Sequence, residues 1–372
     1  MTNKRKKILF IHETLHGGGA EKVFVDLIRR FDRQKYDVSL LLIKGMGVHM
    51  SSLPSWLRTL ALYKAKTSLV HKVRWHFRRS RDIMLKRDLN RILKDERFDT
   101  IVSFLEGPAM KSHYFIMERA KRNVSWVHVN LEVNHWTRYM FRNTAEEAAL
   151  YSKMDEIAFV SHGALDAFVH KFGVDRPMRV IPNVIDTETI RKRAEEEVIP
   201  TSKFTIINVG RLASQKRQDR LIRTAKVLKT MGLDFEVWIL GTGPMEQELK
   251  SLVKKEGVAN EVKFLGFQTN PYPYIKAADM FLLTSDTEGW PTVICEALSL
   301  GCPVVSTRVT GSEELLGTGA GILTSKDPET IGKTVYDLAS SPELLAQYAA
   351  MAAKRGREFN PEEVLKQVYS II

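Results

Sequence analysis

The sequence has little cysteine and no long apolar run. Of its 372 residues only Cys295 and Cys302 are cysteines, and both lie in apolar stretches, as expected for reduced core thiols of a cytoplasmic protein. No apolar run approaches the roughly 18–20 residues that a membrane-spanning helix needs. The first apolar run, Ile8–Ile11, ends at once in His12 and Glu13, which argues against a secretory signal.

Several well-known motifs are also missing. The sequence has no Asp-x-Asp or Cys-x-x-Cys pattern, and we predict no metal site. It has neither Gly-x-Gly-x-x-Gly nor a Walker A loop, which disfavours dinucleotide binding and NTP hydrolysis. A Gly-x-Ser-x-Gly nucleophile elbow is absent as well.

The excess of positive charge lies in one part of the chain. Residues 1–185 carry 33 Lys and Arg against 19 Asp and Glu, whereas residues 186–372 carry 23 against 25. The stretch Arg58–Lys94 alone holds 12 basic and 2 acidic residues. Such a patch attracts an anionic membrane surface, a polyphosphate substrate or nucleic acid. We expect no nucleic acid, because no nucleic-acid-binding motif accompanies the charge.

Short β-rich runs alternate with helical stretches along the chain. Many runs are apolar on successive residues, as in strands covered on both faces of a parallel sheet. The alternation predicts two Rossmann-like, doubly wound α/β domains, 1–185 and 186–372, that face each other across a cleft. The expected strands are Lys7–His12, Asp37–Ile43, Thr100–Phe104, Val124–Val129, Glu156–Val160, Met178–Ile181, Phe204–Val209, Phe235–Leu240, Val262–Leu265, Met280–Thr284, Pro303–Ser306 and Gly321–Leu323.

A glycine-rich turn follows the first expected strand. Gly17, Gly18 and Gly19 lead into a helical stretch. Three glycines let the backbone approach a ligand closely, and the helix N-terminus offers free N–H groups to a phosphate. A tight turn without a ligand is the alternative.

Two cations follow the first strand of the second domain. Arg211 and Lys216 are five residues apart on a loop that leads into a helix. A planar guanidinium and a compact ammonium at this spacing suit a diphosphate held from two sides. Ordinary surface charges on a solvated loop are the alternative.

Two carboxylates flank a helix start near residue 290. Glu288 follows a strand, and Glu296 lies one turn into the next helix, whose first residues are Pro291 and Thr292. One loop thus presents carboxylates and free backbone N–H groups, which suit the vicinal hydroxyls of a sugar. Acidic residues that merely stabilise the helix dipole are the alternative.

Three further polar residues follow expected strands. His128 ends a strand in a context that is also typical of a buried core histidine. Asn183 and Glu313 occupy positions that turn or cap chemistry would explain equally well.

Taken together and in this order, the motifs resemble the retaining family 4 glycosyltransferases of the GT-B fold (glycosyl transferases group 1). The resemblance covers essentially the whole chain. It rests on Gly17-Gly18-Gly19-Ala20-Glu21, Trp126-Val127-His128, Ile181–Asp186, Gly210-Arg211-Leu212 with Gln215-Lys216, Gly241-Thr242-Gly243-Pro244, and Glu288 with Glu296 running into Ala297–Val305. Where the family often has Phe-Gly-Leu-Pro after the first glutamate, this chain has Gly289-Trp290-Pro291-Thr292, which alters the wall beside the sugar.

The resemblance implies a role for each position. Arg211 and Lys216 would hold the diphosphate of a nucleotide-sugar, and Glu296 would bind the ribose hydroxyls. Glu288 would contact the donor sugar, which His128 would face. The remaining implied substrate contacts are the Gly17, Gly18 and Gly19 loop near the phosphates and acceptor, Gly241, Phe267 beside the base, and the backbone of Gly289, Trp290, Pro291 and Thr292. A helix near 361–370 would return to the first domain.

The implied activity is retaining, metal-independent sugar transfer without a cofactor, with a UDP-sugar as the expected donor. The expected acceptor is a glycan on a lipid diphosphate, at the inner face of the plasma membrane. Cations interleaved with Trp56, Trp75 and Phe77 in Arg58–Lys94 suit an anionic membrane, although a solvated helical face is the alternative. A soluble family 4 enzyme acting on a small molecule or polysaccharide, and a non-catalytic nucleotide- or anion-binding protein of the same fold, are the competing hypotheses.

Overall fold

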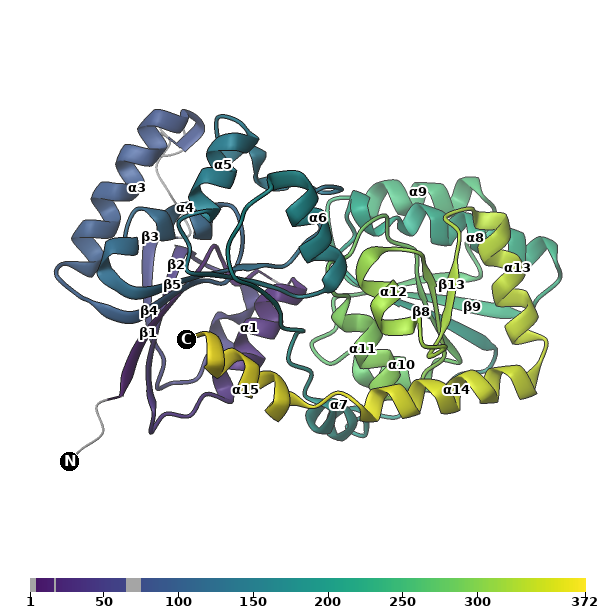
Figure 1. Cartoon of the computed structure of the whole chain (residues 1–372). Helices are drawn as coiled ribbons and strands as arrows, with labels where there is room; N and C mark the ends of the chain where they lie inside the picture. The colour runs from purple at the N-terminus through teal and green to yellow at the C-terminus, as the bar shows by residue number, and fades with distance from the viewer. Residues whose placement is uncertain (1–4, 17, 65–74) are drawn as a thin grey trace. The chain divides into compact units, whose positions relative to one another are not determined.

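The computed structural model describes residues 5–16, 18–64 and 75–372, and the chain divides into two compact units (Figure 1). The first unit comprises residues 1–184 and 362–372, and the second comprises residues 185–361. Each is a parallel α/β sheet with helices, so the predicted fold class of two Rossmann-like domains is confirmed.

The first unit is built on seven parallel strands in the order β3-β2-β1-β4-β5-β6-β7. Strand β1 is buried from Ile8 onward and lies between β2 and β4, where the strand order reverses. The elements are β1 (Lys6–His12), α1 (Gly19–Arg29), β2 (Tyr36–Gly45), η1 (Val48–Ser52), β3 (Arg58–Lys64), α3 (Arg78–Leu93), β4 (Phe98–Ser103), α4 (Pro108–Tyr114), η2 (Met117–Arg119), β5 (Ala120–Val127), η3 (Trp136–Met140), α5 (Thr144–Tyr151), β6 (Glu156–Phe159), α6 (His162–Phe172), β7 (Met178–Val180) and α15 (Pro361–Ile371).

Helix α15 closes the first unit from far along the sequence. The Tyr369 ring stacks on the Tyr36 ring with centroids 4.8 Å apart, and its hydroxyl accepts a hydrogen bond of 2.9 Å from the Asp32 backbone N–H. The Arg122 guanidinium donates to the Ile371 carbonyl at 2.8 Å. Residues 362–372 are therefore part of the structure of this unit.

The basic stretch Arg58–Lys94 differs from its expected form. Its first residues form β3, an edge strand that the sequence did not predict, and Tyr63 is buried in the core of the unit. Trp75 packs against the same core. Most of its described apolar side chains thus stabilise the unit itself. Lys66, Lys72 and Arg74, three of the basic residues counted in this stretch, lie outside the described residues.

The second unit is built on six parallel strands in the order β10-β9-β8-β11-β12-β13, and all six coincide with predicted strands. The order reverses between β8 and β11, so the loops that follow these two strands meet where such sheets bind ligands. The elements are α7 (Thr187–Ala194), β8 (Phe204–Val209), η4 (Ser214–Lys216), α8 (Gln218–Thr230), β9 (Phe235–Leu240), α9 (Glu246–Lys255), β10 (Val262–Gly266), α10 (Tyr272–Ala277), β11 (Met280–Leu283), α11 (Thr292–Ser299), β12 (Val304–Thr307), α12 (Thr310–Leu316), β13 (Ile322–Thr324), α13 (Pro328–Ala339) and α14 (Pro342–Arg357).

Both cysteines are buried and unpaired, as predicted. Burial raises the pKa of the Cys295 and Cys302 thiols, which keeps them protonated in the core. Among the helices of the described ranges, none combines the length and the apolar character needed to cross a bilayer.

Candidate functional site

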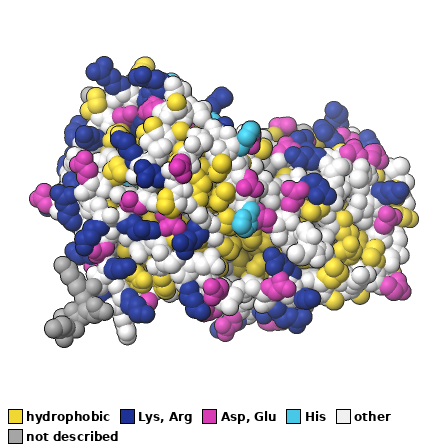
Figure 2. Space-filling view, viewed as in Figure 1, with side chains coloured by type: hydrophobic (Ala, Val, Ile, Leu, Met, Phe, Trp, Pro, Cys, Tyr) yellow, Lys and Arg dark blue, Asp and Glu magenta, His cyan; other side chains and the backbone are white. Residues whose placement is uncertain are grey.

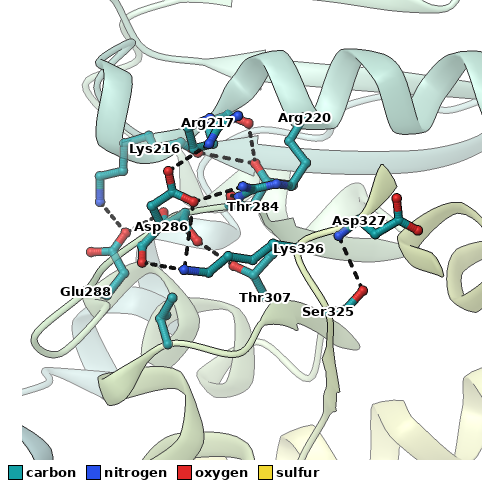
Figure 3. A network of polar contacts seen from close by, with 12 residues as sticks. Lys216, Arg217, Arg220, Thr284, Asp286, Glu288, Thr307, Ser325, Lys326 and Asp327 are labelled. Atoms are coloured by element: carbon teal, nitrogen blue, oxygen red, sulfur yellow. Dashed lines mark hydrogen bonds and ion pairs between the residues drawn. The ribbon is translucent and has the colours of Figure 1, made fainter. Parts of the chain in front are cut away.

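The loops after β8 and β11 are joined by an ion pair at the point where the strand order reverses. The Lys216 Nζ atom lies 2.6 Å from Glu288 Oε1, although the two residues are 72 positions apart (Figure 3). The Ser285 hydroxyl donates to the same oxygen at 2.6 Å. Two residues that the sequence singled out separately, Lys216 and Glu288, therefore lie in direct contact.

Asp286 ties the same two loops together on the other side of the network (Figure 3). Its carboxylate accepts from Arg217 and Arg220, each at 2.8 Å, and its backbone carbonyl accepts from Lys326 at 3.0 Å. Burial raises the pKa of Asp286, but the hydrogen bonds from the two arginines outweigh it and lower the pKa below its usual value. Asp219 also binds Arg217, which adopts a left-handed backbone with φ of 52°.

Arg211 differs from the other cations around these loops. Its side chain is exposed and makes no ion pair with any residue in the described parts of the chain. Arg217 and Arg220 are held by Asp286, and Lys216 by Glu288. Arg211 is therefore the guanidinium available for an anion, and Lys216 can join it only by sharing or leaving Glu288.

Glycines let the loops after β8 and β9 pack backbone against backbone. Gly241 has a φ of 134°, and a Cβ there would lie 2.0 Å from the Gly210 carbonyl oxygen. The Leu212 N–H donates to the Thr242 carbonyl at 3.0 Å. Gly241 thus supports the loop that carries Arg211, which is a structural reason for glycine at this position.

Phe267 follows β10 and is 56% exposed, which is unusual for a phenylalanine. The preceding Gly266 carbonyl accepts a hydrogen bond of 2.7 Å from the Gly241 N–H. The loops after β8, β9 and β10 therefore adjoin one another. Phe267 lies on the third of them, next to the loop that carries Gly241.

The loop before α11 is equally tightly packed. A Cβ on Gly311 would lie 2.5 Å from the Gly289 carbonyl oxygen, and the Gly311 N–H donates to the Glu288 carbonyl at 3.3 Å. Thr292 begins α11 directly after Pro291, and Trp290 packs partly against the core. Glu296 is 4% exposed within this helix. The six candidates Arg211, Lys216, Glu288, Gly289, Trp290 and Thr292 thus share one edge of one sheet.

The remaining candidates belong to the first unit. Gly17 lies outside the described residues. Gly18 caps α1 and Gly19 begins it, and a Cβ on Gly18 would meet the Glu21 carboxylate at 2.2 Å. The helix therefore starts where the sequence predicted, directly after the glycine turn.

His128 follows β5 and is buried, with no hydrogen-bond partner for Nε2 among the described residues. Burial and, to a smaller extent, the nearby His12 lower its pKa to about 3. The imidazole is therefore neutral at physiological pH. Its backbone N–H donates to Glu106 Oε2 at 3.0 Å.

Sequence reasoning missed Glu106. Its carboxylate is buried after β4 and also accepts from the Trp136 indole N–H at 2.9 Å. Burial raises its pKa. The sequence signal that could have identified Glu106 was its position. It follows β4, which lies in the sheet between β1, the strand that ends in His12, and β5, the strand that His128 follows.

Two weaker candidates have simple surroundings. Glu313 lies on the surface in the first turn of α12 and pairs with Arg308 at 3.1 Å, which fits the alternative of ordinary cap chemistry. Asn183 is buried, and its Oδ1 has no partner in the described part of the chain. Within those same residues, no three His, Cys, Asp or Glu side chains gather as a metal ion would require.

Two family models match the chain in succession. The model "Glycosyltransferase Family 4" matches residues 17–189, and "Glycosyl transferases group 1" matches residues 189–355. The two therefore meet within α7, at the start of the second unit.

Curated relatives are similar over parts or all of the chain. The N-acetylgalactosamine-N,N'-diacetylbacillosaminyl-diphospho-undecaprenol 4-alpha-N-acetylgalactosaminyltransferase of Campylobacter jejuni is 33% identical over 221 residues, 58% of this chain and 60% of that relative. The lipopolysaccharide core biosynthesis glycosyltransferase LpsD of Rhizobium meliloti is 23% identical over 98% of this chain and 96% of its own.

A solved structure, Anabaena HepE in complex with UDP, has a TM-score of 0.76 with 20% identity over 98% of each chain. This likeness shows a shared fold. Together with the two family models, which cover both units, it means that the chain belongs to the family 4 and group 1 glycosyltransferases of the GT-B fold.

Proposed function

We propose that this protein is a retaining glycosyltransferase that moves a sugar from a UDP-sugar to a hydroxyl of a lipid-linked glycan during surface polysaccharide assembly. The observation that carries the proposal is the pairing of Lys216 with Glu288 on the same edge as Arg211, which has no ion-pair partner among the described residues, where the strand order of the second unit reverses. This edge offers cations for a diphosphate and carboxylates for hydroxyls.

The similar proteins support the substrates. HepE was solved with UDP, with UDP and glucose, and with UDP-glucose. The Campylobacter jejuni relative is named for transfer to a saccharide on diphospho-undecaprenol, and LpsD for lipopolysaccharide core biosynthesis.

In the proposed reaction the bond between the anomeric carbon and the diphosphate oxygen breaks. The acceptor oxygen bonds to the same face of that carbon, and the departing phosphate takes the hydroxyl proton. Arg211 and Lys216 would stabilise the charge that develops on the diphosphate, without requiring a metal. Glu288 and the backbone of Gly289–Thr292 would hold the sugar, and Glu296 the ribose.

Nucleotide binding tests the donor site. We would measure thermal shifts with UDP, GDP, ADP, UDP-glucose and UDP-N-acetylgalactosamine without added metal, since a ligand at 100 times its Kd stabilises a protein by about 2.7 kcal/mol. We expect a shift with the uridine compounds that is lost in Arg211→Ala/Lys216→Ala. The matched control is Lys354→Ala/Arg357→Ala, two exposed cations on α14. No shift with any nucleotide would contradict the proposal.

The acceptor requires a second assay. Radiolabel from the bound UDP-sugar should enter the solvent-extractable lipid of a bacterial membrane fraction. Label that enters only water-soluble glycan or small molecules would favour the soluble enzyme instead. Binding without any transfer would favour the non-catalytic hypothesis.

We further propose that α3 brings the enzyme to the inner face of the membrane. Its exposed surface carries Arg78, Arg79, Lys86, Arg87 and Arg91, next to Phe77 and Ile83, which are each 63% exposed. Figure 2 shows Lys and Arg side chains over the part of the surface where Figure 1 draws α3. Cations with a few exposed apolar groups suit an anionic bilayer interface.

Vesicle flotation tests this second proposal. We expect recovery with vesicles containing anionic lipid but not with neutral ones, and a loss in Phe77→Ser/Ile83→Ser. Val198→Ser, which changes a 91% exposed residue of the second unit, is the control. Equal recovery with both vesicle types would show that α3 is a solvated face.

A further inference from the structure

The loop after β11 contains a buried hydroxyl that no motif includes. Ser285 is fully buried, and its carbonyl oxygen accepts a hydrogen bond of 2.7 Å from the Thr307 hydroxyl at the end of β12. Thr307 is itself fully buried. Ser285 is therefore anchored to a neighbouring strand and cannot move without breaking that contact.

The hydroxyl of this anchored residue holds Glu288. Ser285 Oγ donates to Glu288 Oε1 at 2.6 Å, and Lys216 Nζ contacts the same oxygen at 2.6 Å. No hydrogen bond to Glu288 Oε2 occurs among the residues that the structure describes. An ionised carboxylate accepts at both oxygens, so one of them remains for a ligand.

The two bonds to Oε1 are not equivalent. In the proposed function Lys216 also binds the diphosphate, so its ammonium group moves toward the ligand when the donor binds. Ser285 has no such second partner and stays with Glu288 throughout. Its bond is the one that fixes the carboxylate orientation while donor is bound.

We propose that Ser285 is a positioning residue that presents Glu288 Oε2 to the transferred sugar. The inference rests on the proposed function, because it assumes that Glu288 contacts the sugar. The proposal predicts that loss of the Ser285 hydroxyl impairs sugar transfer from a UDP-sugar. Binding of UDP should be unaffected, because UDP has no group that contacts Glu288.

The test compares UDP binding with sugar transfer in Ser285→Ala. A hydrogen bond to a charged group is strong enough that its loss should reduce kcat roughly 10- to 100-fold. The Kd for UDP, measured by calorimetry, should stay within about twofold of the parent value. Transfer is followed with radiolabelled UDP-glucose or UDP-N-acetylgalactosamine, whichever the parent protein uses.

Ser299→Ala is the matched control. Ser299 is also buried in the second unit, but its hydroxyl donates to the Cys295 carbonyl of its own helix at 2.7 Å. Loss of a buried hydroxyl alone should therefore lower stability similarly in both variants and lower kcat only in Ser285→Ala. Should Ser285→Ala not fold, Ser285→Cys keeps the volume with a weaker donor and should show the same selective loss.

The outcomes separate the inference from the proposed function. Unchanged transfer by Ser285→Ala, or a parallel loss of UDP binding and transfer, would overturn the positioning role and leave the proposed function standing. A parent protein that binds no UDP and transfers no sugar would overturn both.

Discussion

Lys216 and Glu288, which lie on different loops of the second unit, form an ion pair at 2.6 Å. Each is only partly exposed, so their contact is shielded from water more than a surface ion pair is. In the proposed function the diphosphate and the sugar approach this pair together. Binding of the donor would thus replace the Lys216–Glu288 contact with two contacts to the donor, one from each residue.

Glu288→Gln should separate sugar recognition from nucleotide binding. Glutamine keeps an oxygen for Ser285 but loses the charge, so transfer should fall roughly 100-fold, whereas UDP should bind at least as well because Lys216 is released. Radiolabel transfer and calorimetry with UDP measure the two effects. Glu313→Gln, a surface change, serves as control. Near-normal turnover of Glu288→Gln would remove Glu288 from the site.

Asp286→Asn should loosen both loops. It removes the charge that holds Arg217 and the nearly buried Arg220, so we expect a loss of about 2 kcal/mol, below the value for a fully buried pair because Asp286 is partly exposed. Urea unfolding measures it, with Asp234→Asn, an exposed partner of Lys203, as control. Equal stabilities of the two variants would show that the Asp286 network contributes little.

Gly241→Ala should damage the second unit much more than Gly232→Ala. Both glycines have positive φ, which alone costs about 1 kcal/mol for alanine, but a Cβ meets the Gly210 carbonyl only at Gly241. We therefore expect Gly241→Ala to lose UDP binding and melt earlier, and Gly232→Ala to bind normally. Similar thermal shifts with UDP in both variants would contradict this explanation.

Stability should fall as the pH is lowered from about 6.5 toward 4. Burial lowers the pKa of His12 and His128 to about 3 and that of His113 to about 4, so the unfolded chain binds more protons in this range. Each contributes about 2 kcal/mol of destabilisation by pH 5. Free energies of unfolding measured at pH 7 and pH 5 check the summed destabilisation. His113→Gln should make the dependence of stability on pH less steep. A pH-independent stability would contradict the buried neutral state.

Strands of the second unit were predictable because each is a short apolar run bounded by turn residues. β3 was missed for a physical reason: Arg58–Lys64 is an edge strand with a cation at each end, and such strands lack the continuous apolar pattern of central ones. The same residues therefore looked like part of a charged surface.

The sequence allowed the candidate site residues to be selected one by one, but it did not predict their contacts. Arg211, Lys216 and Glu288 could be chosen because each follows a strand. Their pairing could not, because sequence spacing does not indicate that two loops meet where the strand order reverses. Ser285 and Asp286 were passed over since a single hydroxyl or carboxylate in a loop carries no signal until its partners are known.

The return of α15 also bears on the order in which the chain folds during synthesis. All of residues 185–361 leave the ribosome before residues 362–372, which supply Tyr369 to the first unit. The second unit can therefore be complete while the first still lacks its last helix. Although translation starts with the first unit, we expect the second unit to mature first.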